Sequence, residues 1–331
     1  MTIGIRFQAV AEDQPGAQWQ ALFARSWPGY RAWFLRSGTV GRPTYLECRR
    51  ALRQHMPELV PTWERLVELA GGGDLEARFL SLWRPPAYIA GCSQAVWPDA
   101  GDAQGPALLR NYDYAPALLE GNWLATRWTG QRVLAMSDCL WGALDGLNAS
   151  GLAASLSFGG RTIAGEGFGI PLVLRYVLEV ATDTASAIAI LQRVPVHMCY
   201  SVTLLDARGA WATVFLNPDR PVEVTRRAAV TNFQHAVEWP EHARATAACE
   251  RLDALQALAG AGAPVQAAVD ALLREPLYQP AWERGYGTLY TAAYAPRAGR
   301  VQLLWPGTCW TQTLDAFEEG EREITFLSPA P

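Results

Sequence analysis

The amino-acid sequence predicts an α+β fold in which antiparallel sheets are covered by helices. After position 92, short runs of alternating apolar and polar residues are separated by turn sequences, which is typical of β-hairpins. Before position 92, apolar residues recur at three- and four-residue steps, which predicts helices. Because strands joined by hairpins pair antiparallel, the helices are expected to lie outside the sheets.

The composition of the 331-residue chain excludes several classes of protein. Half of the residues are hydrophobic and 18% are charged, which allows a large core and argues against long disorder. The formal net charge of −4 argues against a nucleic-acid partner. The chain contains no lysine, so lysine nucleophiles and Schiff bases are excluded.

The cysteines and the apolar runs predict a cytoplasmic protein without a membrane partner. Six cysteines lie far apart with no C-x-x-C pair, so free thiols in a reducing compartment are expected. The first residues lack the pattern of a secretion signal. The longest apolar runs, such as 170–174, are far shorter than a membrane span.

Residues 1–91 are expected to form a mainly helical segment. Helices are predicted over 45–56 and 57–69, and the three glycines at 71–73 end the second one. Proline at 85 and 86 stops any further helix. The segment carries no obvious chemistry of its own.

Residues 92–331 are expected to form one catalytic domain, because no linker or internal repeat interrupts them. Four hairpins are predicted, pairing 123–128 with 132–137, 141–146 with 152–158, 200–205 with 210–216, and 288–294 with 300–305. A last strand is predicted over 322–326. Helices are predicted over 171–180, 184–193, 241–258 and 263–274.

Common catalytic and cofactor motifs are absent from the sequence. There is no G-x-S-x-G, P-loop or H-E-x-x-H, and the glycine-rich stretch 165–169 lacks the dinucleotide spacing. The four histidines do not reach metal-ligand spacing with one another. We therefore expect neither a metal nor an organic cofactor.

Cys92 is the candidate nucleophile, and it needs a base. If the chain were cleaved after Gly91, the new α-amino group of Cys92, with a pKa of about 7.7–8.0, would suit proton abstraction near neutrality. A dyad with His235 or His242 is an alternative, although nothing local supports it. A second alternative is that Cys92 is a small buried hydrophobic residue with no catalytic role.

Four short motifs in order give the sequence a resemblance to a known family. They are GCSQ at 91–94, LRNYDY at 109–114, DGLNASGL at 145–152 and VTN at 230–232. The set resembles the N-terminal-nucleophile (Ntn) hydrolases of the penicillin (isopenicillin N) acyltransferase and choloylglycine hydrolase group. The similarity extends to 287–291 and 305–307, and 57–73 looks like the helical propeptide of the acyltransferase branch.

The resemblance implies a four-layer αββα sandwich and a set of roles. Cys92 would be both the autocleavage residue and the nucleophile of the mature chain. Arg110 would hold its thiolate, since a nearby cation lowers the pKa of a cysteine, and Asp113 would orient the new α-ammonium group. Asn148 would lie near the amine and the oxyanion, and Asn232 with a backbone N–H would stabilise the oxyanion.

The sequence departs from the family pattern at several positions. Ser93 replaces the common threonine, and Phe233 follows Asn232 where the acyltransferase branch usually has histidine. The family's further arginine has two candidates here, Arg244 and Arg251. The turn sequence around Asn148 favours asparagine on its own account, so a structural role stays open for this residue.

The function that the resemblance implies is acyl transfer from a linear, non-peptide amide of a small N-acyl compound through a thioester. Residues 1–91 would then be a propeptide or α subunit, and residues 92–331 the catalytic domain. An unprocessed small-molecule binding protein of the same fold and a Cys–His hydrolase without autocleavage are the alternatives. Association into a homo-oligomer stays open.

Overall fold

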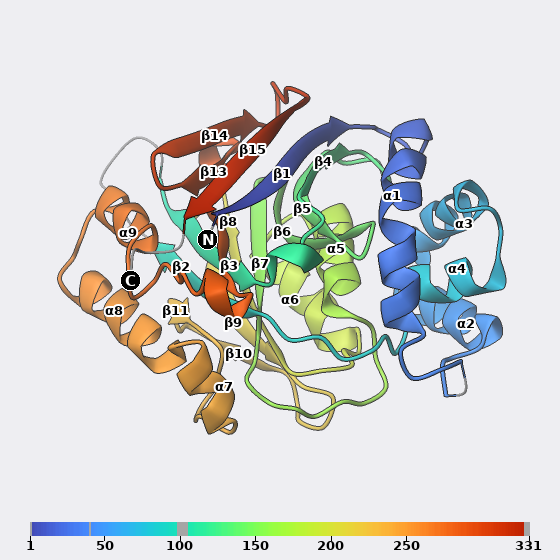
Figure 1. Ribbon diagram of the computed structural model, residues 1–331, viewed down its shortest axis with the longest axis horizontal. Helices are drawn as coiled ribbons and strands as arrows, with labels where there is room; N and C mark the ends of the chain where they lie inside the picture. The colour runs from blue at the N-terminus through green and yellow to red at the C-terminus, as the bar shows by residue number, and fades with distance from the viewer. Residues whose placement is uncertain (1, 40, 98–104, 328–331) are drawn as a thin grey trace.

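Two β-sheets packed face to face form the centre of the molecule (Figure 1). The computed structural model describes residues 2–39, 41–97 and 105–327. The larger sheet has the order β10-β9-β8-β7-β6-β5-β4-β1-β15, and the smaller has the order β11-β2-β3-β12-β13-β14. β2 and β3 of the smaller sheet lie against β7 and β8 of the larger one.

The strands of the larger sheet are β1 (Thr2–Ala11), β4 (Asn122–Thr126), β5 (Val133–Asp138), β6 (Gly142–Asn148), β7 (Leu152–Phe158), β8 (Tyr200–Asp206), β9 (Trp211–Leu216), β10 (Glu223–Thr225) and β15 (Gly320–Leu327). Those of the smaller sheet are β2 (Gly91–Trp97), β3 (Ala107–Tyr114), β11 (Ala229–Val230), β12 (Gly287–Ala295), β13 (Arg300–Trp305) and β14 (Thr308–Thr313). All four predicted hairpins are confirmed as antiparallel pairs, because each is a local strand–turn–strand pattern.

Helices cover the outer faces of both sheets, which confirms the four-layer αββα arrangement. On the larger sheet lie α5 (Ile170–Val180) and α6 (Thr184–Arg193). The smaller sheet is covered by α8 (Ala248–Gly260) and α9 (Val265–Leu272), with α7 (Pro240–Ala245) beside α8. The helix predicted over 241–258 is divided into α7 and α8, since Ala247 has a left-handed backbone with φ of 48°.

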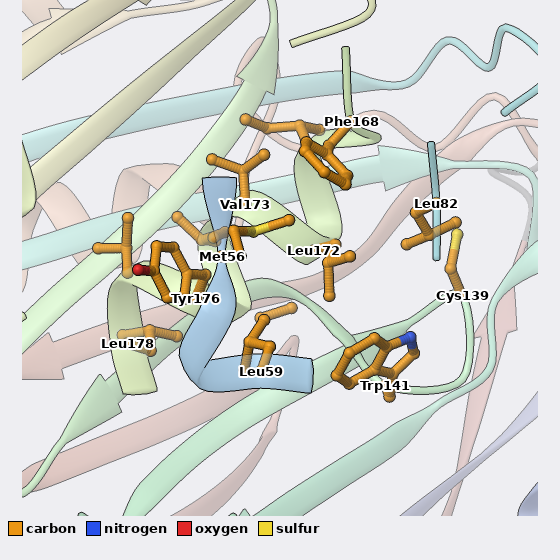
Figure 2. Close-up of a cluster of buried hydrophobic side chains, with 14 of the residues drawn as sticks. Met56, Leu59, Leu82, Cys139, Trp141, Phe168, Leu172, Val173, Tyr176 and Leu178 are labelled. Carbon is orange, nitrogen blue, oxygen red and sulfur yellow. The ribbon is translucent and has the colours of Figure 1, made fainter. Parts of the chain in front are cut away.

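The N-terminal helices form a separate group at the end of the molecule opposite α7–α9 (Figure 1). They are α1 (Ala17–Phe34), α2 (Tyr45–His55), α3 (Val60–Leu69) and α4 (Asp74–Leu80). α2 and α3 correspond to the two predicted helices, with a short 3₁₀ turn at Pro57–Leu59 between them. Figure 2 shows how Met56 and Leu59 of this segment pack with Trp141, Leu172 and Tyr176.

The segment 1–91 contains, besides its helices, the strand β1, which was not predicted. β1 lies inside the larger sheet, parallel to β4 and antiparallel to β15. Its side chains alternate, with Phe7 and Ala9 buried between the sheets and Arg6 exposed. This period of two is the sequence signal of a strand.

Candidate active site

The smaller sheet brings the first three predicted site residues together. β2 and β3 pair antiparallel, so that Gly91 lies opposite Asp113, and Gln94 lies opposite Arg110. β2 is buried along its whole length, so its sequence has no alternating pattern and gives little sign of a strand. A fourth predicted residue, Asn232, lies beside them because Val230, at the end of β11, pairs with Gln94 of β2.

The Cys92 thiol is fully buried and lies beside a buried cation. Arg110 Nη2 donates to Cys92 Sγ over 3.4 Å. Burial raises the pKa of Cys92, and the charge of Arg110 opposes this effect. The thiol is therefore protonated at neutral pH in the uncleaved chain, and its surroundings contain a group that would stabilise a thiolate.

A carboxylate and an aromatic ring hold Arg110 in place. Its Nη1 lies 2.6 Å from Asp145 Oδ2 in an ion pair with no exposed surface, and it also donates to the carbonyl of Leu144. The guanidinium lies over the ring of Tyr112, 4.9 Å from its centroid. Asp145 in turn accepts hydrogen bonds from the hydroxyls of Tyr290 and Tyr294 on β12. These contacts keep Arg110 in one orientation, and its buried Nε has no hydrogen-bond partner among the described residues.

Arg251 is the second buried arginine at this site. From α8 its Nη1 donates to Ser93 Oγ at 2.8 Å and to Asp113 Oδ2 at 3.0 Å. Its Nη2 donates to Asn232 Oδ1 at 2.7 Å. Arg244, the other candidate from the sequence, is exposed and pairs with Glu241 at 3.7 Å. The two differ because Arg251 lies on α8, which packs on the smaller sheet, whereas Arg244 lies on α7.

Asn232 and Asp113 surround the peptide bond that precedes Cys92. Asn232 Oδ1 accepts the backbone N–H of Cys92 at 3.0 Å, while its Nδ2 donates to the carbonyls of Ala90 at 3.4 Å and Phe158 at 3.2 Å. Asp113 Oδ1 accepts from Thr288 Oγ1 at 2.7 Å. Burial raises the pKa of Asp113, and the Arg251 guanidinium opposes the rise.

Gly91 is in very close contact with Tyr286. A Cβ added at Gly91 would lie 1.7 Å from Tyr286 Oη and 3.2 Å from Asp113 Cβ, so no other residue fits without movement. Among the described residues, the buried Tyr286 hydroxyl has no hydrogen-bond partner. Burial raises its pKa, so the hydroxyl keeps its proton and is a donor without an acceptor. The sequence gave no sign of this residue.

Asn148 is committed to contacts on the other side of the larger sheet. Its Nδ2 donates to the carbonyls of Leu178 at 3.0 Å and Ala181 at 2.7 Å at the end of α5. Its Oδ1 accepts the backbone N–H of Leu152 at 3.0 Å across the β6–β7 turn. These contacts account for the side chain as a support of the turn and of α5, and none of them joins it to Cys92.

The two histidines considered as partners of Cys92 have other neighbours. His235 is half-exposed and pairs with Glu223 at 3.0 Å. His242 packs against the rings of Phe158 and Trp239. Neither forms a hydrogen bond to Cys92 within the described ranges.

No group of three or more histidine, cysteine or acidic residues in the described part of the chain could hold a metal ion. No helix among residues 2–39, 41–97 and 105–327 is long and apolar enough to cross a bilayer.

Two packed sheets between helical layers define the class of Ntn hydrolases. The family model of acyl-coenzyme A:6-aminopenicillanic acid acyl-transferase matches residues 100–310, and the chain belongs to this family. It is thus a member of a group of amide hydrolases and acyltransferases. The match begins after Cys92, so the candidate nucleophile lies outside it. No curated protein matches the sequence.

Several solved structures are similar at low sequence identity. Penicillin V acylase from Agrobacterium tumefaciens is 15% identical with a TM-score of 0.48, covering 68% of this chain and 86% of that one. The Caenorhabditis elegans ortholog of N-acylethanolamine-hydrolyzing acid amidase is 14% identical with a TM-score of 0.44, covering 70% and 100%. A mutant conjugated bile acid hydrolase from Clostridium perfringens is 12% identical with a TM-score of 0.40, covering 70% and 96%.

Proposed function

We propose that this chain is an autoprocessed cysteine hydrolase or acyltransferase that acts on the linear amide bond of a small N-acyl compound. One observation carries the proposal. The backbone nitrogen of Cys92 is already bound by Asn232, whose Oδ1 is shared with Arg251, while Asp113 lies opposite Gly91. Cleavage before Cys92 would release an α-amine into a site with acceptors ready for it.

The proposed processing step uses the Cys92 thiol against the preceding carbonyl. Sγ adds to the carbonyl carbon of Gly91, the C–N bond breaks, and the thiol proton passes to the departing nitrogen. Water then hydrolyses the thioester, leaving a carboxylate on Gly91 and a free thiol on Cys92. Tyr286, an unpartnered donor beside Gly91, would stabilise the oxyanion of this step.

The mature reaction follows the same chemistry on a bound amide. The α-amine of Cys92 takes the thiol proton, and the thiolate beside Arg110 attacks the substrate carbonyl. Asn232 Nδ2 and a backbone N–H would stabilise the oxyanion. Each such donor lowers the activation barrier by about 3–4 kcal/mol. The amine leaves with the proton, and water or a second amine resolves the thioester. We leave Asn148 outside this set, because its amide is committed elsewhere.

Intact mass spectrometry of the purified chain tests the processing step. We expect two fragments, one ending at Gly91 and one beginning at Cys92, whereas the Cys92→Ala variant stays whole. A matched control is Cys249→Ala, which changes an exposed cysteine and should leave cleavage unchanged. A parent chain that stays whole, with the mass pattern of its Cys92→Ala variant, would contradict the proposal and favour an unprocessed binding protein.

Release of amine from a panel of N-acyl amides tests the reaction. We expect turnover by the processed chain and none by the Cys92→Ala variant. If His235→Ala or His242→Ala abolished turnover in a chain that is not cleaved, the Cys–His alternative would replace this proposal.

A further inference from the structure

A cavity of about 560 Å³ lies close to the scissile peptide bond. It is bounded by α1, by the segment 87–89 that leads to Cys92, and by residues that follow β3 and end β5. Its volume is within the range of about 300–1,000 Å³ that is usual for small-molecule sites. Two carboxylates, Glu120 and Asp138, face it together with the aromatic side chains Tyr30, Trp33, Tyr88 and Tyr114.

The two carboxylates of the cavity have no cation as partner. Three buried carboxylates elsewhere in the described part of the chain are each paired with a buried arginine, in Asp113–Arg251, Asp145–Arg110 and Glu179–Arg175. Neither Glu120 nor Asp138 forms an ion pair with any described residue. A negative charge out of bulk water without a counter-charge is costly, so this pair differs from those three carboxylates.

The hydrogen-bond donors around the pair are all neutral groups. The Tyr30 hydroxyl lies 2.5 Å from Glu120 Oε1 and 3.1 Å from Asp138 Oδ1, yet it has a single proton to donate. The backbone N–H of Leu140 donates to Glu120 Oε1 at 2.6 Å, and Oε2 accepts from Ser137 Oγ at 3.0 Å and from Asn122 Nδ2 at 3.4 Å. None of these donors carries a charge. Burial, with the nearby Glu120 charge, raises the pKa of Asp138 to about 7.

The nearest arginines are engaged with neutral oxygens. Arg36, which also borders the cavity, is exposed and donates from Nη2 to the carbonyl of Ala87 at 2.8 Å. Arg25 is likewise exposed, and its Nη2 donates to Asn122 Oδ1 at 2.8 Å. Neither guanidinium neutralises the pair.

Two tyrosine hydroxyls near the cavity are buried and have no partner within the described ranges. Tyr88 belongs to the cavity wall, and its Oη is buried without a hydrogen bond. Tyr200 is 1% exposed, its Oη is also unpartnered, and its ring lies 6.5 Å from that of Tyr88. Unsatisfied buried hydroxyls beside an empty volume are expected where a polar ligand supplies the missing contacts.

The cavity is within reach of the nucleophile. Ile89 lines it and precedes Cys92 by three residues, which span at most about 10 Å of extended chain. Tyr114 of the wall has its ring 5.8 Å from that of Tyr112, and Tyr112 lies opposite Cys92 in the β2–β3 pair. After the proposed cleavage, the segment 87–91 would end as a free carboxylate beside the same cavity.

We propose that this cavity binds a primary ammonium group, carried by the substrate within about 10 Å of the scissile carbonyl. An ammonium supplies the charge that Glu120 and Asp138 lack and three N–H donors for their free acceptor positions. The aromatic walls add attraction between the cation and the ring faces. The assignment to substrate rests on the proposed function, whereas binding of an amine by the cavity does not.

Calorimetric titration of the full-length Cys92→Ala chain at pH 8 tests binding in the uncleaved state. The probes are phenethylamine and its neutral counterpart 2-phenylethanol. We expect the amine to bind at least about tenfold more tightly, the usual loss when a charged hydrogen bond is removed. Equal affinity for the two probes, or no binding of the amine, overturns the proposal without the need for any cavity variant.

Variants locate the binding to the cavity. In the Cys92→Ala background, Asp138→Asn and Glu120→Gln should each weaken amine binding by about tenfold. Asp13→Asn, which changes a 67% exposed carboxylate, is the matched control and should bind as the parent does. If both cavity variants fold and bind the amine as tightly as the control, the site lies elsewhere and the proposal is wrong.

Turnover by the processed chain tests the substrate class. N-acetyl-1,5-diaminopentane and N-acetyl-5-aminopentan-1-ol differ only in the ammonium and hydroxyl ends. We expect kcat/KM to favour the first by about tenfold, and Asp138→Asn to remove the preference through KM. Equal rates for the two amides contradict the substrate assignment. If the chain is neither cleaved nor active, the proposed function fails, while the amine titration still decides what the cavity binds.

Discussion

At the scale of single residues, the contact of Gly91 with Tyr286 is the most restrictive feature of the site. The space at Gly91 is filled by a tyrosine hydroxyl and by the Asp113 side chain. A side chain at position 91 would displace the carbonyl that Cys92 is proposed to attack. Because reacting atoms must approach to within about 3–3.5 Å, a small displacement is enough to slow the reaction.

We therefore expect Gly91→Ala to slow autocleavage by at least about a hundredfold, the loss that follows a 1 Å misplacement. The measurement is the rate at which the two fragments appear by mass spectrometry. Gly260→Ala is the control, since a Cβ there meets nothing within 4 Å. Cleavage of Gly91→Ala at the parent rate would show that the contact does not constrain the bond.

Replacing each of the two arginines that the sequence left open should affect the stability of the protein very differently. Arg251→Leu leaves Asp113 buried without its counter-charge, which costs about 3–5 kcal/mol. Arg244→Leu removes only an exposed pair and should cost less than about 1 kcal/mol. Urea denaturation of both variants in the Cys92→Ala background measures the difference. Similar losses for both would mean that the burial of Arg251 does not translate into stability.

The carboxylate pair predicts a pH dependence of stability. The pKa of Asp138 in the folded chain is about 7, raised from the usual 3.8 by burial and by Glu120. Folding therefore favours the protonated form, and this stability is fully present below 3.8 and is lost as the pH rises through about 7. Asp138→Asn removes the titrating group.

We accordingly expect Asp138→Asn to become more stable relative to its parent as the pH rises from about 4 to 8. The measurement is the free energy of unfolding in denaturant at several pH values. Asp13→Asn, at an exposed site, should show no such trend. A stability difference between Asp138→Asn and its parent that stays constant across this range would contradict the assignment of the raised pKa to Asp138.

At the scale of elements, the site depends on two strands and a helix that come from distant parts of the chain. β2 and β3 set the spacing of Cys92, Arg110 and Asp113, and α8 delivers Arg251 from the far side of the smaller sheet. β11 is only two residues long, yet its pairing with β2 places Asn232 against the Cys92 nitrogen. Short pairings of this kind position side chains without adding much stability of their own.

β1 is the element that ties the N-terminal segment to the larger sheet. It lies between β4 and β15, and Phe7 packs edge-on against Trp305 in the core between the sheets, with ring centroids 4.8 Å apart. Phe7→Ala should therefore destabilise the folded chain by about 3–5 kcal/mol, the usual cost of removing a buried phenylalanine side chain. Arg6→Ala, on the exposed face of the same strand, is the control, and chemical denaturation measures both. Equal effects would mean that β1 contributes no buried core.

At the scale of the whole molecule, the proposed cleavage would cut a chain whose two parts share a sheet and a core. Residues 2–11 are hydrogen-bonded on both sides by strands from beyond position 92. Helices from residues 17–80 pack against α5 through the cluster in Figure 2. We expect the two fragments to elute together in size-exclusion chromatography after cleavage and to separate only in denaturant. Separation in plain buffer would show that these contacts do not hold the parts together.

Some features of the fold and of the site could be predicted from the sequence, and others could not. The hairpins were predictable, because their strands and turns are adjacent in the chain and leave a local pattern. The motifs around Cys92, Arg110, Asp113 and Asn232 were found in order, and the structure brings these four residues together. The strand β2 itself was not predicted, since burial on both faces removes the alternation by which strands are recognised.

The features that could not be predicted depend on contacts between residues that are far apart in the sequence. Arg244 and Arg251 look alike along the chain, and only the packing of α8 on the smaller sheet buries Arg251 against Asp113. Asn148 carries a family motif, yet its amide is engaged by the end of α5. The Tyr286 hydroxyl and the uncompensated pair Glu120–Asp138 had no sequence signal at all. Burial, partner choice and the absence of a partner depend on which segments meet in space, and that is set by the packing of the layers.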